Sequence, residues 1–315
     1  MEQKDLVIIG GGAAGLTAAI FSARRGVSTA VAAIEIGGQT AIPISIGNYP
    51  GFENIAGAEL MERMRVQAEK EGVEFIYGKV SRVDKTGAGF ITRLSNGTDI
   101  PSKAVILAYG KAPRTLGIPG EDKYMGKGIF TSVIHDNYFY AEKTVGVIGG
   151  GNSAFGTALE CAVSAKKVYI INRSENFRGE EKTLEKIKAT PNIELLTNCI
   201  PDSFDGDGEW LKSIVTKDSV TGKISKLGLD MAFVNIGLET KNDFCAHLVK
   251  LNEFKEIAID TNCRTGTDGL FACGDATSIP FKQTVISAGE GAKASIEAYK
   301  FIKGDKARTA NDWTH

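Results

Sequence analysis

The sequence LVIIGGGAAG, from Leu6 to Gly15, joins an apolar run to a turn whose residues have little or no side chain. An Ala-rich amphipathic stretch, residues 16–25, follows it. A buried strand that ends in such a turn lets the backbone N–H groups of the next helix approach a pyrophosphate. The stretch therefore predicts a strand, a tight turn and a helix that together bind a dinucleotide.

A second glycine motif stands in the same context. The sequence GGGNSA, from Gly149 to Ala154, follows the apolar run 145–148 and precedes the amphipathic stretch 155–164. One such motif alone can be an ordinary turn, but a strand before it and a helix after it are typical of a Rossmann-type unit. The two copies predict two bound dinucleotides, which indicates electron transfer.

Length and charge narrow the class of protein. At about 150 residues per domain, 315 residues correspond to two domains. The net charge of -1 provides no basic field for nucleic acid, and no apolar run reaches the roughly 18 residues that span a membrane. The N-terminal apolar run resembles a signal peptide, but Gly10 interrupts it and the motif uses it as a strand. We therefore expect a cytoplasmic protein with neither a nucleic-acid nor a membrane partner.

Cysteine and histidine usage argues against a metal site. The five cysteines form no Cys-x-x-Cys, and the three histidines are scattered. An odd number of cysteines in such a chain is typical of reduced thiols. Cys161 and Cys273 are predicted to be small buried residues.

The order of the predicted elements places one unit inside the other. The first unit continues from the first motif through a helix, a strand meander and an apolar strand, at 60–72, 73–94 and 104–108. The second unit contains the second motif, three strands and a charged helix, at 168–171, 211–216, 231–236 and 180–189.

The last predicted strand and helix, 269–275 and 283–302, need a partner sheet, and the first unit offers one. We therefore predict an α/β fold of two Rossmann-like, three-layer ββα dinucleotide-binding domains, the second inserted into the first. Residues 1–114 and 240–315 form the first domain, and residues 115–239 form the second.

This arrangement and six short motifs resemble the low-molecular-weight thioredoxin reductases of the pyridine nucleotide-disulphide oxidoreductase superfamily. The resemblance covers nearly the whole chain. The motifs are Val7 to Gly15, Gly37-Gly38-Gln39, Asn48-Tyr49-Pro50-Gly51, Gly149 to Ala154, Gly274-Asp275 and Lys282-Gln283-Thr284. The resemblance implies a homodimer that binds FAD at the first glycine motif and NADPH at the second.

The FAD site that the resemblance implies combines the first motif with residues from later segments. They are Gly10, Gly12, Ala13, Ala14, Gly15, Glu35, Gly38, Gln39, Asn48, Ala108, Gly110, Gly274, Asp275, Lys282, Gln283 and Thr284. In the family, the position of Asn48 touches the isoalloxazine and that of Asp275 bonds the ribityl and phosphate region. Without the resemblance, Asn48 and Asp275 are ordinary turn or cap residues.

A helix that begins near Gln283 would direct its partial positive charge at the flavin and stabilise the negative charge of the reduced form.

An acidic side chain that binds the adenosine ribose is expected at the end of the second strand. The aligned position there is Ala32, so Glu35, just beyond it, is the candidate.

The chain departs from the family where the redox dithiol belongs. In place of Cys-x-x-Cys followed by Asp it has the sequence SVIHD, from Ser132 to Asp136. Serine and histidine cannot accept two electrons by thiol–disulfide exchange, so the chain cannot reduce thioredoxin by the family's mechanism. His135 and Asp136 are candidate catalytic residues that handle the flavin's protons, and the alternative is a structural or solvated histidine.

The NADPH site is also altered. It would comprise the second motif and two arginines after the next strand: Gly149, Gly151, Asn152, Ser153, Ala154, Arg173 and Arg178. Ser174 replaces a third arginine of the family's basic cluster. One lost charge-assisted hydrogen bond weakens binding roughly ten- to a hundredfold. The alternative for both arginines is solvated surface charge.

Three functions from different classes remain open. The first is an FAD enzyme that moves electrons between NADPH and a ferredoxin or flavodoxin, which requires no dithiol. The second is an FAD enzyme reduced by another donor and acting on a small disulfide, quinone or oxygen. The third is a flavin-binding regulator or scaffold without turnover. The rings of Trp313 and His315 are candidates for stacking on an exposed flavin, although a disordered end is the common outcome.

Overall fold

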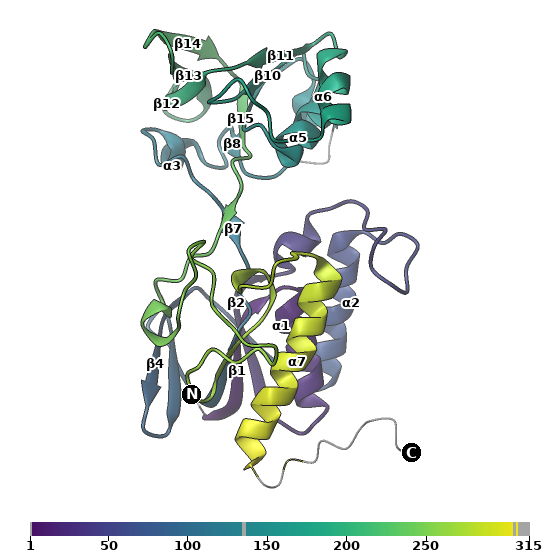
Figure 1. The fold of residues 1–315 in the computed structure, drawn as a ribbon, viewed down its shortest axis with the longest axis vertical. Coiled ribbons are helices and arrows are strands. Elements are labelled where there is room, and N and C mark those ends of the chain that lie inside the picture. The colour runs from purple at the N-terminus through teal and green to yellow at the C-terminus, as the bar shows by residue number, and fades with distance from the viewer. Residues whose placement is uncertain (1, 134–136, 305–306, 308–315) are drawn as a thin grey trace. The chain divides into compact units, whose positions relative to one another are not determined.

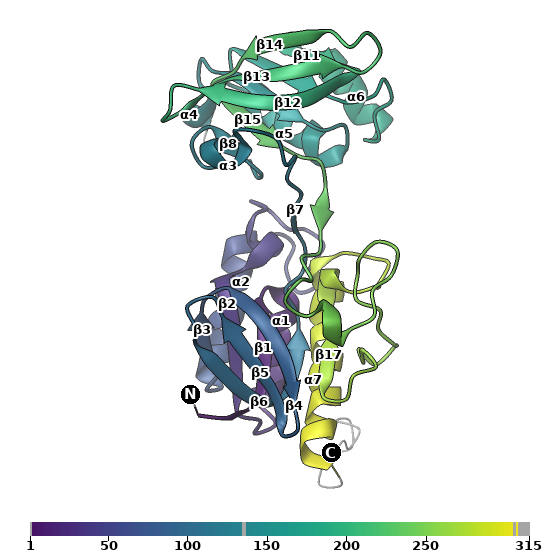
Figure 2. The ribbon, with the colours of Figure 1, turned by 90° about the vertical axis from the view of Figure 1, so that its left-hand side faces the viewer.

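The computed structural model describes residues 2–133, 137–304 and 307 of the chain. The chain divides into two compact units (Figures 1 and 2), one formed by the residues up to Lys111 and from Thr240 on, the other by Ala112–Glu239. The first boundary precedes the expected one at 114, because Ala112–Pro113 pairs with Leu238–Glu239 inside the second unit. Both units are Rossmann-like, as the sequence predicts.

The first unit contains a parallel sheet, an antiparallel meander and three long helices. Its strands are β1 (Lys4–Gly11), β2 (Thr29–Ile36), β3 (Glu74–Tyr77), β4 (Val80–Thr86), β5 (Gly89–Leu94), β6 (Asp99–Leu107) and β17 (Leu270–Ala272). Its α-helices are α1 (Ala13–Ala23), α2 (Gly57–Lys70) and α7 (Thr284–Lys303), and its short 3₁₀ helices are Gly38–Ala41, Ala246–Leu248 and Gly274–Ala276.

Strand β6 joins the parallel and antiparallel parts of one seven-stranded sheet. Its first half pairs antiparallel with β5, which continues to β4. Its second half pairs parallel with β1 on one side and β17 on the other, and β2 and β3 extend this sheet beyond β1. The unit therefore has the three predicted layers: helices, a parallel sheet and an antiparallel meander.

The apolar run of β1 is buried on both faces. Leu6 and Ile8 pack into a core with alanines of α1 and α7, whereas Val7 and Ile9 pack into a second core that includes Phe90 of the meander. A parallel strand covered on both sides is expected to be apolar at every position rather than at alternate ones. This explains why the run has no polar residue.

Helix α7 packs closely on α1, and α1 also contacts α2 (Figure 1). A Cβ atom on Gly291 would lie 2.1 Å from the Ala14 carbonyl oxygen, so only glycine permits this contact. Farther along, the Ser22 and Ser295 hydroxyls form a buried hydrogen bond of 2.8 Å. These contacts fix both ends of α1 against a helix that follows it by more than two hundred residues.

The second unit repeats the arrangement with a separate antiparallel sheet. Its strands are β7 (Ala112–Pro113), β8 (Ile129–Phe130), β9 (Thr144–Ile148), β10 (Lys167–Ile171), β11 (Ile193–Leu196), β12 (Cys199–Gly206), β13 (Leu211–Asp218), β14 (Ile224–Gly228), β15 (Met231–Val234) and β16 (Leu238–Glu239). Its helices are α3 (Glu121–Tyr124), α4 (Asn137–Tyr140), α5 (Asn152–Ala162) and α6 (Glu181–Lys188).

The parallel sheet of this unit has the order β11-β10-β9-β15-β8, and β12, β13 and β14 form the antiparallel sheet (Figure 2). The predicted strands at 168–171, 211–216 and 231–236 and the helix at 180–189 correspond to β10, β13, β15 and α6. Strands β11, β12 and β14 were not predicted, because short, half-exposed strands such as β14, with Ile224 66% exposed, have no buried alternation. None of the helices among the described residues is long and apolar enough to cross a membrane.

Glu297 of α7 is a buried carboxylate that forms ion pairs with Arg264 and Lys300. Burial raises its pKa, but the hydrogen bonds from Lys300 and Arg264 outweigh burial and hold the pKa below its usual 4.5. Such a group stabilises the fold above the pKa of the unfolded chain, and the contribution is lost as the pH falls through the folded pKa.

We expect Glu297→Gln to lower the free energy of unfolding in urea by about 1–2 kcal/mol near neutral pH. The difference from the unsubstituted protein should shrink as the pH falls below about 4.5. Glu185→Gln is the control and should cost little, because Glu185 is exposed and its one ion pair within the described residues is with Lys188. A difference for Glu297→Gln that is independent of pH would contradict the assignment.

Candidate functional site

The turn between β1 and α1 contains glycines of two kinds. Gly10 has φ +115°, and a Cβ atom on it would lie 2.4 Å from the Ala108 carbonyl oxygen. A Cβ atom on Gly15 would lie 1.9 Å from the Gly10 carbonyl oxygen. Gly10 and Gly15 are therefore required by the packing of the chain itself.

No contact among the described residues requires a glycine at position 12. Its φ of −83° suits any residue, and within that part of the chain the one atom within 4 Å of its Cβ position is the Gly37 carbonyl oxygen, at 3.8 Å. It is the N-cap of α1, and no side chain caps the helix. The N–H groups of Ala13 and Ala14 begin this helix, where the first turn has no intrahelical acceptors. The open space in front of them fits a phosphate group.

A cavity of about 540 Å³ lies in the same unit between the loop after β2 and the start of α7. Its lining includes six of the predicted FAD residues, which are Gln39, Asn48, Asp275, Lys282, Gln283 and Thr284. Asn48 Nδ2 donates to Gln283 Oε1 at 3.1 Å, and the Thr40 and Thr284 hydroxyls are 3.2 Å apart. These two bridges hold the two sides of the cavity together.

Asp275 lies in the turn that follows β17. Gly274 before it has φ +75°, and a Cβ atom on that glycine would lie 2.9 Å from the Cβ atom of Ala14. Asp275 Oδ1 accepts a hydrogen bond of 2.9 Å from Ser287, one turn into α7. Within the described residues, no donor forms a hydrogen bond with Asp275 Oδ2. This oxygen can therefore accept a hydrogen bond from a ligand in the cavity that Asp275 lines.

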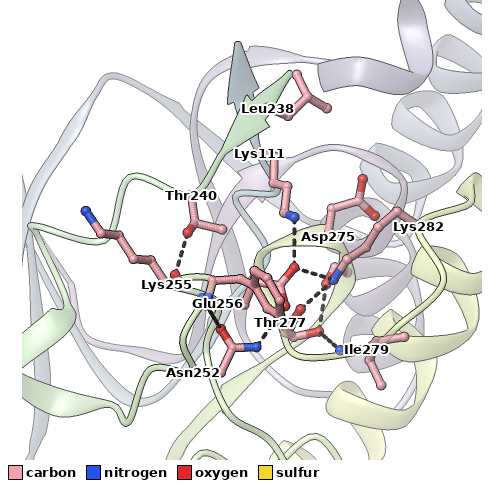
Figure 3. A network of polar contacts seen from close by, with 12 residues as sticks. Lys111, Leu238, Thr240, Asn252, Lys255, Glu256, Asp275, Thr277, Ile279 and Lys282 are labelled. Carbon is pink, nitrogen blue, oxygen red and sulfur yellow. Dashed lines mark hydrogen bonds and ion pairs between the residues drawn. The ribbon is translucent and has the colours of Figure 1, made fainter. Parts of the chain in front are cut away.

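Lys282 lines the cavity, but its ammonium group is bound within the protein. It donates to the Thr277 carbonyl oxygen at 2.5 Å and forms an ion pair with Glu256 at 3.2 Å (Figure 3). The backbone then passes through Gln283, the N-cap of α7, which has no side-chain cap. The unpaired N–H groups of the first turn, from Thr284 on, are thus close to the cavity.

Three predicted FAD residues lie on the edges of the glycine turn. Glu35 is exposed at the end of β2, beside Ile36, which pairs with Gly11. Gly38 has φ +53°, and its Cβ position is 3.8 Å from the Gly12 Cα atom. Gly110 has φ +65°, and no atom of the described residues lies within 4 Å of its Cβ position.

The second glycine turn has the same two kinds of glycine. A Cβ atom on Gly149, with φ +139°, would lie 2.3 Å from the Asn235 carbonyl oxygen, whereas Gly151, with φ −106°, has nothing within 4 Å. Gly151 is the N-cap of α5, Ser153 is exposed in the first turn and Ala154 is buried. This turn also fits a phosphate group.

The loop after β10 folds onto this turn. Asn172 is buried and donates to the carbonyl oxygens of Ser174 and Asn176. The Arg178 N–H donates to the Gly150 carbonyl oxygen at 2.7 Å. Asn152 Oδ1 accepts from the Glu180 N–H at 2.7 Å, so this side chain positions the loop.

Arg173 and Arg178 are both exposed, and neither guanidinium pairs with a carboxylate among residues 2–133 and 137–304. Two free cations beside an open glycine turn fit a phosphorylated ligand. The candidate catalytic residues His135 and Asp136 lie outside the described residues, as do Trp313 and His315.

The cysteines do not form a reactive centre. All five are free thiols, and Cys161, Cys245, Cys263 and Cys273 are buried. Burial raises the pKa of Cys161 to about 12 and that of Cys245 to about 11, so neither is a thiolate at neutral pH. The described part of the chain contains no group of His, Cys, Asp and Glu side chains that could hold a metal ion.

Sequence reasoning missed Ser287, Glu256 and Lys111. Ser287 follows Thr284 by three positions and therefore shares its helix face, a signal that the sequence did contain. Glu256 and Lys111 have no such signal, because each comes from a different loop.

The chain is similar to known proteins over almost its whole length. Residues 4–295 match the family described as pyridine nucleotide-disulphide oxidoreductase. The chain is 34% identical over 304 residues to a subunit of alkyl hydroperoxide reductase from Xanthomonas campestris pv. phaseoli, covering 96% of this chain and 57% of that protein. It is 34% identical over 307 residues to thioredoxin reductase of Helicobacter pylori, covering 95% and 99%.

A solved structure is also similar to this chain. The crystal structure of Lactococcus lactis thioredoxin reductase has a TM-score of 0.83 and 33% identity to this chain, covering 95% of this chain and 99% of that one. The chain thus spans a little over half the length of the alkyl hydroperoxide reductase relative and nearly the whole length of the thioredoxin reductases.

A side chain on Gly12 would occupy the open space in front of α1. We expect Gly12→Val to fold but to bind FAD about tenfold or more weakly, because the pyrophosphate loses its place. The measurement is the ratio of flavin to protein absorbance after purification, with thermal unfolding as the check on folding. Gly87→Val is the matched control, since the Cβ position of Gly87 is likewise open, with no described atom within 4 Å, but Gly87 lies in the β4–β5 turn. Equal flavin content in both variants would contradict the assignment.

Proposed function

Since the chain belongs to the pyridine nucleotide-disulphide oxidoreductase family, we propose that it transfers electrons between NADPH and an acceptor that is not a dithiol. The family uses FAD, and its thioredoxin reductases use NADPH. One observation carries the proposal: both units keep an open glycine turn, at Gly12 and Gly151, while the chain has no Cys-x-x-Cys.

The first unit would hold FAD between three of its segments. The pyrophosphate would bind the N–H groups of Ala13 and Ala14, and Glu35 would bind the adenosine ribose. Asp275 Oδ2 would accept a hydrogen bond from the ribityl chain, while Asn48 would face the isoalloxazine. Bound FAD supplies the conversion between a hydride and single electrons, which no side chain of the protein can perform.

The start of α7 would stabilise the reduced form of the flavin. The helix has 20 residues and no side-chain cap, so its N-terminal N–H groups and partial positive charge are available to an anion. Negative charge that develops on the flavin beside Gln283 and Thr284 would be stabilised there. Ser287 contributes indirectly, because its hydroxyl holds Asp275 in place.

The second unit would hold NADPH. Gly151 and Ala154 would frame the pyrophosphate, and Arg173 and Arg178 would bind the 2′-phosphate. Asn172, at the end of β10, is uncharged and engaged in the loop, so no carboxylate occupies the position that would select an unphosphorylated ribose.

The acceptor would be a one-electron protein of the ferredoxin or flavodoxin type. Burial raises the pKa of the four buried thiols, Cys161, Cys245, Cys263 and Cys273, so none of these four supplies a thiolate for disulfide exchange at neutral pH. His135 and Asp136 would handle the proton that accompanies the electrons. Ser174, which removes one cation from the loop, favours a second candidate in which another redox protein replaces NADPH as donor.

Anaerobic mixing separates these two candidates. We expect NADPH to bleach the visible flavin absorbance faster than NADH, because Arg173 and Arg178 discriminate by charge. Replacing both arginines with serine should weaken the response to NADPH by about a hundredfold or more and leave that to NADH nearly unchanged. Lys217→Ser, an exposed cation of β13, is the control. Bleaching by dithionite but by neither nucleotide would overturn the NADPH proposal in favour of another donor.

Thiol alkylation tests the acceptor class. We expect iodoacetamide treatment of the NADPH-reduced protein to leave the electron flux to ferredoxin, flavodoxin or an artificial one-electron acceptor unchanged, because four of the five thiols are buried. A thioredoxin reductase that carries the family's dithiol is the positive control and should lose its disulfide reduction. Inactivation of this protein would show that a cysteine takes part after all.

A further inference from the structure

Glu256 is a nearly buried carboxylate, 8% exposed, that binds two lysines of the first unit (Figure 3). Its Oε1 atom lies 2.8 Å from Lys111 Nζ and 3.2 Å from Lys282 Nζ. Its Oε2 atom accepts from Asn252 Nδ2 at 2.9 Å, and Asn252 Oδ1 accepts from the Glu256 N–H at 2.9 Å. Both carboxylate oxygens and their loop are therefore fixed.

Lys282 connects this carboxylate to the cavity. It lines the cavity, its ammonium group is held by Glu256 and the Thr277 carbonyl oxygen, and it directly precedes Gln283 and Thr284. Fixing the Lys282 side chain therefore restrains the segment that enters α7.

The network carries a net positive charge. Lys111 and Lys282 contribute two cations, and Glu256 cancels one of them. Burial raises the pKa of Glu256, but the hydrogen bonds from Lys111, Asn252 and Lys282 outweigh burial and lower it, so the carboxylate is charged at neutral pH. All three side chains are mostly shielded from water, where charges are screened least.

We propose that Glu256 is a positioning residue that sets the reduction potential of the flavin, by fixing Lys282 at the cavity and by cancelling one of the two positive charges of this network. This inference rests on the proposed function, because it requires FAD in that cavity. Reduction adds negative charge to the flavin, so positive charge nearby raises the potential and Glu256 lowers it.

The same loop also holds both segments that connect the units. Lys111 is the last residue before β7, and Glu256 binds it. On the returning segment, Thr240 Oγ1 and Asn242 Nδ2 both donate to the carbonyl oxygen of Lys255, the neighbour of Glu256. Lys111 is the second cation that pairs with Glu256. A substitution of Lys111 therefore tests independently whether the charge of this network affects the flavin.

The test is the midpoint potential of the bound flavin in purified holoprotein, measured against a reference dye. We expect Glu256→Gln to keep its FAD and to shift the ratio of reduced to oxidised flavin about tenfold toward reduced, or about 30 mV for a two-electron couple. Glu297→Gln is the matched control, because Glu297 is a similarly buried carboxylate with two cationic partners, placed about 20 Å along α7 from its start.

A double-mutant cycle shows whether Glu256 acts through Lys282. In a Lys282→Met background, the effect of Glu256→Gln should fall to half or less. Lys111→Met is the second variant. It removes one positive charge from the network and should therefore lower the potential, whereas Glu256→Gln raises it. It also keeps the test decisive if Glu256→Gln does not fold.

The outcomes are distinct. An unchanged potential in Glu256→Gln and Lys111→Met, an equal shift in Glu297→Gln, or an undiminished effect in the Lys282→Met background would overturn the inference. A purified protein that binds no FAD even when FAD is added would instead overturn the proposed function. Full FAD content with an unchanged potential defeats the inference alone.

Discussion

The contact of the first turn of α1 with the backbone around it is the constraint on which the first unit depends. Gly274 and Gly291 come from the other end of the chain, yet both approach Ala14 so closely that a Cβ atom would collide with it. This contact brings Asp275 and the start of α7 beside the glycine turn. The cavity, the uncapped helix and the free carboxylate oxygen all depend on that approach.

The elements that could be predicted from the sequence are those formed by residues close together in the chain. A strand, a glycine turn and a helix follow one another along the chain at both motifs, so periodicity and glycine spacing were sufficient to predict them. Both motifs also proved to mix two kinds of glycine, which a sequence alone cannot distinguish. Gly10 and Gly149 prevent collisions inside the protein, whereas Gly12 and Gly151 leave open space at the start of a helix, which fits a phosphate group.

The polar network around Glu256 was beyond prediction because its members are distant in sequence. Lys111 ends one connection, Glu256 lies in an irregular loop and Lys282 precedes a helix, so no local pattern links them. Lys282 was predicted to belong to the FAD site. It lines the cavity, and its ammonium group binds Glu256 and the Thr277 carbonyl oxygen. A charge at a binding site can thus act through its position and balance without touching the ligand.

The pairing of β6 with β17 has a consequence for how the chain folds. Val105 and Leu270 are neighbours in the sheet, although the whole second unit is synthesised between them. On a ribosome, the inserted unit is complete while its host still lacks one strand and the helix α7. We therefore expect the inserted unit to fold first and the host to wait for its last 75 or so residues, a delay that its high contact order would lengthen.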